Sequence, residues 1–219
     1  MQTAGSDGET PRALVRAAAI AGVVRPALFA TVFVALTTVQ YEFMIEIGWR
    51  PLRDPAGAWP SGLALGPYGR AMTASFVASG LLLMLFTVGL HLGATGGRGS
   101  PAGPALLLVS GAAMALMGFE TDPMRRTGPR SLHGWLHDLA FVLFALALLL
   151  ALVFLWRRLR RDALWRGHAP YTLFTGAFAV LLLFLPGAAF YLFLVVVLVW
   201  FEVTALRLWR TCAPSSPRR

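Results

Sequence analysis

Long runs of apolar residues alternate with short polar stretches along the chain. Several of these runs approach or exceed the roughly 18 to 20 residues that an α-helix needs to cross the hydrocarbon core of a membrane. The pattern therefore predicts an all-α, polytopic membrane protein, a bundle of six transmembrane helices. The predicted helices cover about residues 15–46, 68–92, 103–119, 131–156, 170–185 and 188–208.

The last two helices come from one apolar run, residues 171–201, which contains no charged residue. At about 1.5 Å per residue this run is too long for a single span. Pro186-Gly187 is a turn signal near its middle. We therefore predict two helices that meet at this dipeptide.

The first apolar run has a charged interruption. Residues 17–24 have the length of a signal-peptide core, but Arg25-Pro26 follows and the apolar run then continues to Gln40. A first helix that stays in the membrane fits this pattern better than a cleaved signal peptide.

Composition agrees with a single membrane domain. The 219 residues are 57% hydrophobic and only 13% charged, whereas a soluble domain carries roughly a quarter charged residues. We predict one membrane domain over 15–208, a disordered cytoplasmic N-terminus over 1–14 and a cytoplasmic tail over 209–219. All 19 basic residues are arginine, and the chain has neither Lys nor Asn, which is typical of a GC-rich bacterial genome. The single cysteine, Cys212, excludes an intramolecular disulfide.

The net charge of +9 does not indicate nucleic-acid binding. The arginines lie at the ends of apolar runs, where topology and anionic lipid headgroups account for them, so membrane lipids are the predicted partners. Six spans place both termini on one side. Twelve arginines fall on that side and six on the other, so the positive-inside rule places both termini in the cytoplasm of a bacterial cell membrane.

Acidic residues and histidines gather on the predicted outer side. The segment 119–138, FETDPMRRTGPRSLHGWLHD, joins the third helix to the fourth, and QYEFMIEIGW ends the first helix. His133 and His137 are four residues apart near the start of a helix that Ser131 is placed to cap. The candidate cluster consists of Glu42, Glu46, Glu120, Asp122, His133 and His137.

Two histidines at helical spacing beside carboxylates form a ligand set suited to a divalent metal such as zinc, or to iron or manganese. The simpler alternative is a structural network, in which arginines on the same side pair with the acids: Arg50, Arg53, Arg125, Arg126 and Arg130. A third alternative is a ligand-binding or transport site. The HExxH pattern of many zinc proteases is absent, because Gly134 follows His133.

Other polar and small residues within the helices have structural interpretations. Glu202 lies inside the last helix, and we predict that Arg25 or Arg207 pairs with it. Ser75, Ser79 and the small residues of 111–118 are predicted to let helices pack closely. The residues predicted to form interfacial aromatic belts are Trp49, Trp59, Tyr68, Trp156, Trp165 and Trp209.

Two motifs resemble the signatures of a bacterial and archaeal membrane family catalogued as domain of unknown function family 998. MGFETDP, residues 117–123, followed by LHGWLHD, residues 132–138, is similar to the second signature, and MIEIG, residues 44–48, is similar to the first. The resemblance covers about residues 20–205 and implies the six-helix layout. It narrows the candidate site to Glu46, Asp122, His133 and His137. It implies no biochemical activity, and Ile45 stands where the family has a serine, which argues against serine-based catalysis in this chain.

From these residues we predict metal-assisted hydrolysis, of a lipid for example, at the outer membrane surface. His133, His137 and Asp122 would hold the metal, and Glu46 would act as the general base on a bound water. The alternatives are a small-molecule or lipid binding or transport protein, with a cavity that reaches Glu202, and a non-catalytic scaffold or accessory subunit.

Overall fold

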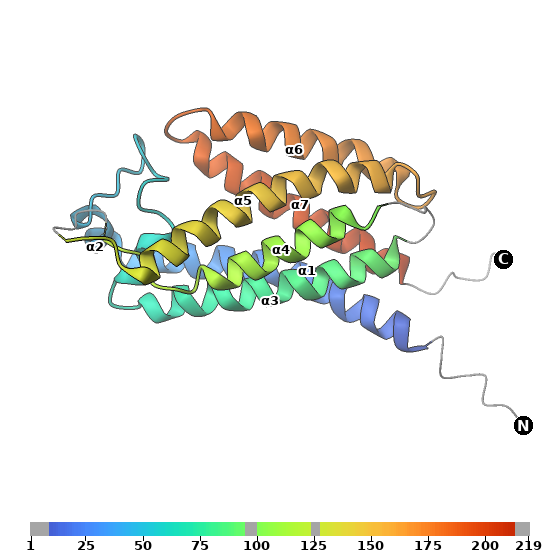
Figure 1. Ribbon diagram of the computed structural model, residues 1–219, viewed down its shortest axis with the longest axis horizontal. Coiled ribbons are helices and arrows are strands. Elements are labelled where there is room, and N and C mark those ends of the chain that lie inside the picture. Colours follow the sequence, from blue (N-terminus) through green and yellow to red (C-terminus); the bar gives the residue numbers. More distant parts are fainter. Residues whose placement is uncertain (1–8, 95–99, 124–127, 213–219) are drawn as a thin grey trace, which may run out of the picture.

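The computed structural model describes residues 9–94, 100–123 and 128–212, and these are helical with no β-strand. Six helices of 15 to 31 residues run alongside one another (Figure 1). They are α1 (Glu9–Val39), α3 (Gly69–Gly93), α4 (Ala102–Leu116), α5 (Leu132–Leu159), α6 (Ala169–Leu183) and α7 (Ala189–Thr211). The short elements are α2 (Tyr41–Glu46) and the 3-10 helices η1 (Ser61–Leu65) and η2 (Arg166–His168).

The six long helices form a closed ring. Each packs against the next one along the chain, and α7 packs back against α1. Glu9 and Thr211 lie at one end of this ring, here called the terminal end, and α2 lies at the other, here called the α2 end (Figure 1). Close packing between α3 and α4 depends on small residues, because a Cβ on Gly80 would lie 2.5 Å from the Gly111 carbonyl oxygen.

Four of the long helices have the length and apolar composition of membrane spans. They are α3, α5, α7 and residues Arg12–Val39 of α1. The other two, α4 and α6, have 15 residues each, or about 22 Å of helix, which is less than the roughly 30 Å of a bilayer core. The chain is therefore a membrane-embedded helical protein, and six crossings stay a prediction.

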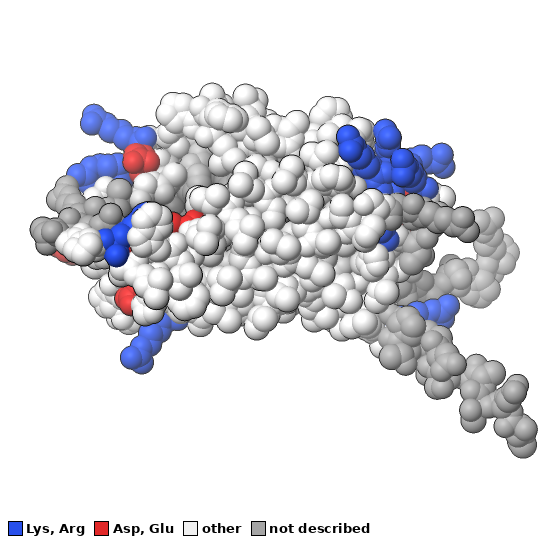
Figure 2. All heavy atoms as spheres, viewed as in Figure 1, with Lys and Arg blue, Asp and Glu red and all other residues white. Residues whose placement is uncertain are grey.

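The surface matches a membrane environment. Figure 2 shows a broad uncharged belt between two ends that carry basic side chains, with the visible acidic side chains mainly at the α2 end. Within the belt, large apolar side chains face outward, including Leu139, Leu146, Phe174, Leu181, Leu192 and Val199. Lipid chains would cover such a surface.

The first predicted helix, about 15–46, differs from the structure at its start and in its interior. It begins at Glu9, so residues 9–14 of the predicted disordered segment are helical, whereas residues 1–8 lie outside the described part of the chain. It also breaks at Gln40, whose φ of −113° and ψ of 22° leave the helical region. The buried Gln40 side chain donates to the Leu63 carbonyl (3.2 Å) and accepts from the Tyr68 amide (2.9 Å), and so ties the break to the loop after α2.

The other boundaries differ less. The predicted third helix extends to 119, but α4 ends at Leu116, and the predicted tail over 209–219 begins inside α7, which runs to Thr211. The chain turns between α6 and α7 at Pro186-Gly187, where Gly187 has a φ of +66°. Residues 213–219 lie outside the described range.

Three of the predicted interfacial tryptophans are buried instead. Trp49, Trp59 and Trp165 are each at most 5% exposed. Trp59 packs edge-on against Phe33 and Tyr191, and its indole N–H donates to the Thr37 hydroxyl. Trp59 therefore fixes the loop after α2 on α1 and α7 rather than marking a membrane surface.

Candidate functional site

A pocket of about 450 Å³ lies inside the ring at the α2 end. This volume falls within the roughly 300 to 1,000 Å³ of small-molecule sites. Its apolar walls come from α1, α3, α4, α5 and α7, and its polar groups come mostly from the loops and from the first turns of α5. The aromatic wall residues include Phe29, Phe76, Phe141, Phe144, Phe190 and Phe193, and the polar residues near the loops include Ser61, Asp122, Arg130, His137 and Asp138.

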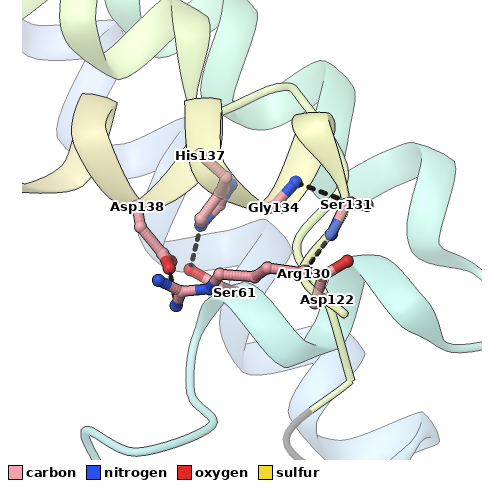
Figure 3. A network of polar contacts seen from close by, with 7 residues as sticks. All are labelled: Ser61, Asp122, Arg130, Ser131, Gly134, His137 and Asp138. Atoms are coloured by element: carbon pink, nitrogen blue, oxygen red, sulfur yellow. Dashed lines mark hydrogen bonds and ion pairs between the residues drawn. The ribbon is translucent and has the colours of Figure 1, made fainter. Parts of the chain in front are cut away.

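His137, only 3% exposed, sits between α4 and η1 (Figure 3). Its Nδ1 lies 3.0 Å from the Met117 carbonyl oxygen and 2.9 Å from that of Phe119. Since carbonyl oxygens only accept, Nδ1 carries the proton in the neutral ring. Nε2, 2.9 Å from the Ser61 hydroxyl oxygen, is then free to accept the hydroxyl proton. The arrangement is a serine paired with a histidine base whose ring is oriented from the far side.

The first turn of α5 is fixed by Asp122 and Ser131 (Figure 3). The Ser131 amide donates to Asp122 Oδ2, and the Ser131 hydroxyl accepts from the Gly134 amide, both at 2.9 Å. Ser131 is thus the predicted N-cap. A Cβ at position 134 would lie 2.2 Å from Asp122 Oδ2, so only glycine lets the carboxylate sit there.

Arg130 and Asp138 form an ion pair beside the pocket. The Arg130 guanidinium also lies 4.8 Å from the centre of the Trp135 ring. Both members of the pair line the pocket, so the charges there are mutually compensated.

Arg25 of α1 lies at the opposite, inner part of the pocket and is 2% exposed. Its Nη2 points to the Met114 sulfur at 3.2 Å, and its guanidinium lies 4.0 Å from the centre of the Phe201 ring. Neither Nε nor Nη1 has a hydrogen-bond partner among the described residues. The predicted pairing with Glu202 is wrong, since no ion pair joins Glu202 to Arg25 or Arg207 in the described part of the chain.

The structure brings together two of the four predicted site residues. Asp122 and His137 both line the pocket, whereas His133 and Glu46 do not. His133 is exposed and stacks on Phe119, with ring centroids 5.9 Å apart. Glu46 is exposed at the end of α2, as is Glu42 one turn earlier.

The predicted metal ligands His133, His137 and Asp122 gain no support from this geometry. Within residues 9–94, 100–123 and 128–212, no three His, Cys, Asp or Glu side chains are grouped to hold a metal ion. His137 already uses both ring nitrogens on protein groups. Arg125 and Arg126, considered as partners for the acids, lie outside the described residues.

A family model described as "Protein of unknown function (DUF998)" matches residues 28–209. The chain belongs to the DUF998 family. Comparisons with curated proteins and with solved structures give no match. In this DUF998 chain the HGWLH motif supplies the buried His137 and the glycine against which Asp122 packs.

Two residues of the site escaped sequence reasoning. Ser61 lies in the loop after α2, far from the histidines in sequence, and nothing in the segment around it indicates its contact with His137. The sequence does mark Arg25 as unusual, because it is a lone charge in an apolar run, but it led to the prediction of an acidic partner. The structure instead places it against a sulfur and an aromatic ring.

Proposed function

We propose that this protein binds an amphiphilic molecule, such as a single-chain lipid, in the pocket at the α2 end. The observation that carries the proposal is the pocket itself, which combines a long aromatic wall with polar groups near the loops. An apolar chain would lie along the wall, and a polar group would meet polar or charged side chains at either end, near the loops or at Arg25. The distribution of arginines supports an orientation with the termini in the cytoplasm, so the pocket would face the outer leaflet.

A pocket-filling substitution tests this function. Leu194 of α7 lines the pocket, whereas Leu192, two residues earlier, is exposed and does not line it. We expect Leu194→Trp to lower the amount of co-purified amphiphile at least tenfold, because the indole would occupy the pocket. The measurement is mass spectrometry of lipids retained by protein extracted into polymer-bounded nanodiscs, with Leu192→Trp as the control. Equal lipid content in the wild type and both variants would contradict the proposal.

A second candidate function, hydrolysis of a bound ester, rests on the hydrogen bond between Ser61 and His137. Ser61 Oγ would attack the ester carbonyl carbon while its proton passes to His137 Nε2. His137 would then protonate the leaving alcohol, and a water molecule, activated in the same way, would release the acid and restore Ser61. The carbonyls of Met117 and Phe119 would hold the imidazole in the required tautomer.

A fluorophosphonate probe tests this second candidate. We expect covalent labelling of the wild type in membranes, its loss in Ser61→Ala, and at least tenfold slower labelling in His137→Gln. Ser100→Ala, at the terminal end, should label like the wild type. If Ser61→Ala is labelled as fast as the wild type, Ser61 is not a nucleophile and its hydrogen bond only fixes the loop.

A further inference from the structure

Arg25 is a buried cation without an anionic partner among the described residues. Its guanidinium has five N–H donors, and the described residues offer it a thioether sulfur and the face of a phenyl ring. Both are weak partners compared with a carboxylate or a carbonyl oxygen. No Asp or Glu side chain pairs with it among the described residues. Burying a charge in this way is costly unless an ionic or strongly accepting group compensates it.

Arg158 shows how the same fold treats a buried arginine that has a structural role. It is 6% exposed, and its Nη2 donates to the carbonyl oxygens of His91 and Ala94, at the end of α3. Carbonyl groups in the last turn of a helix generally lack partners within it, and a basic side chain satisfies them. Arg25 has no such helix end to bind. Its two unpartnered nitrogens therefore need another explanation.

The pocket supplies that explanation, because Arg25 lines it. The other cation of the pocket lining, Arg130, is neutralised by Asp138. Among the described residues, Arg25 is therefore a pocket-lining cation that no carboxylate pairs with, and it lies among apolar side chains such as Phe29, Phe193 and Val197. One guanidinium matches one monoanionic oxygen group, and a carboxylate that accepts from Nη2 and a neighbouring nitrogen would replace the weak contact of Nη2 with the Met114 sulfur.

We propose that Arg25 is an anion-binding residue and that the pocket takes a long-chain carboxylate. The carboxylate accepts hydrogen bonds from Arg25, and the alkyl chain follows the aromatic wall towards the loops of the α2 end. This inference rests on the proposed amphiphile-binding function and adds the chemical class of the ligand. The pocket volume favours a single chain, since a two-chain lipid would leave most of its apolar surface outside a space of about 450 Å³.

Competition between an acid and its neutral analogue tests the charge preference. The protein, in nanodiscs of phosphatidylcholine at pH 8.5, is photolabelled with a diazirine-bearing palmitic acid and challenged with palmitate or 1-hexadecanol. We expect palmitate to displace the probe from the wild type at a concentration at least tenfold lower than hexadecanol. Equal potency of the two competitors would overturn the inference even without a variant.

Substitutions locate the preference at Arg25. Arg25→Met keeps the length of the side chain and removes a buried charge, so the bundle should fold. It should bind palmitate and hexadecanol equally, whereas Arg25→Lys should retain part of the preference. An unchanged preference in Arg25→Met would assign the charge recognition elsewhere and overturn the inference.

The same assay separates this inference from the proposed function. In Leu194→Trp the pocket is filled, so saturable labelling should disappear for any competitor. Labelling that is not saturable in the wild type, or that persists in Leu194→Trp, would remove the amphiphile-binding function itself. If Leu194→Trp abolishes saturable labelling but the wild type shows no preference for the acid, the amphiphile-binding function would be supported. Only the role of Arg25 would then be contradicted.

Discussion

Gly134 lies where any side chain would meet the carboxylate of Asp122. That carboxylate accepts a hydrogen bond from the Ser131 amide. This amide is one of the N–H groups at the start of α5 that have no partner within the helix. The start of α5 in turn sets the position of His137 and of the Arg130–Asp138 pair. A small change at position 134 therefore acts on the whole polar part of the pocket.

We expect Gly134→Ala to lower the free energy of unfolding by about 1 to 3 kcal/mol, the usual cost of overpacking. The added Cβ would lie 2.2 Å from Asp122 Oδ2, so the carboxylate must move. Thermal unfolding in detergent measures the effect. Gly167→Ala is the control, because nothing lies within 4 Å of a Cβ there. Equal melting temperatures for the two variants would show that Asp122 moves aside without cost.

At the residue scale, the sequence predicted the cap but not the directions of the histidines. Ser131 caps α5 as expected, because its hydroxyl precedes the first apolar turn. His133 and His137 were expected to share one ligand set because they are four residues apart on the same helix. His133, in the first turn, projects beyond the packed region and is exposed, whereas His137, one turn later, lies between α4 and η1. That difference depends on where the neighbouring helix ends, which local spacing does not encode.

At the scale of elements, the break between α1 and α2 positions the loop that carries Ser61. The hydroxyls of Thr37 and Thr38 donate hydrogen bonds to the carbonyl oxygens of Phe33 and Val34. The side-chain amide of Gln40 then forms hydrogen bonds with the loop. Apolar periodicity across 15–46 gave no sign of this break, because the loop partners of Gln40 are 23 and 28 residues away.

We expect Gln40→Leu to lower the free energy of unfolding by about 1 to 3 kcal/mol, since the Tyr68 amide loses its acceptor. The loop over 61–68 should also exchange amide hydrogens faster, which hydrogen–deuterium exchange with mass spectrometry measures. Thr38→Val, which removes an exposed local hydrogen bond, should leave exchange in that loop unchanged. Unchanged exchange in Gln40→Leu would mean that other contacts, such as those of Trp59 and Ser61, hold the loop.

A second link between elements depends on pH. His168, at the end of η2, donates from Nε2 to the Thr204 hydroxyl oxygen on α7 (3.0 Å), because that hydroxyl donates its own proton to the Trp200 carbonyl. Burial, and then the positive charge of Arg207, lower the pKa of His168 from 6.5 to about 4. The unfolded chain therefore binds more protons than the folded protein between these two values.

The contribution of the buried, neutral His168 to the free energy of unfolding should accordingly be fully present above pH 6.5, and it should decrease as the pH falls towards 4. We expect the free energy of unfolding to fall by about 1 kcal/mol between pH 7.5 and 5.5. Chemical unfolding in detergent at a series of pH values measures this change. His168→Gln should reduce this dependence, and His91→Gln, at an exposed position, should retain it. A pH dependence that is the same in His168→Gln and the wild type would assign it to other groups.

At the scale of the whole molecule, neighbours along the chain are also neighbours in the ring. Apolar run lengths predicted the all-helical class and the membrane-embedded nature of the protein, because a helix in contact with lipid requires a continuous apolar surface. They did not predict the pocket. Its lining combines residues from positions 25 to 198, and its volume depends on how far five helices separate at the α2 end.

Topology can be tested with the single cysteine. We expect Cys212, at the terminal end, to resist a membrane-impermeant maleimide in intact bacterial cells and to react after permeabilisation, because the terminal end is predicted to be cytoplasmic. In a Cys212→Ala background, Leu52→Cys should react in intact cells, as Leu52 is 81% exposed at the α2 end. The reverse labelling pattern would invert the orientation and place the pocket on the cytoplasmic side.

The shortness of α6 has a consequence for the membrane itself. Its 15 residues give about 22 Å of helix, and Phe174, Phe178 and Leu181 face outward along it. With the six predicted crossings, a bilayer of ordinary thickness in contact with this face would be mismatched, and it would reduce the mismatch by thinning locally. The lipid layer around the protein would then be uneven, with a thin sector beside α6. Short-chain lipids would gather in such a sector, so membrane thickness and acyl-chain length would influence where this protein resides in a cell.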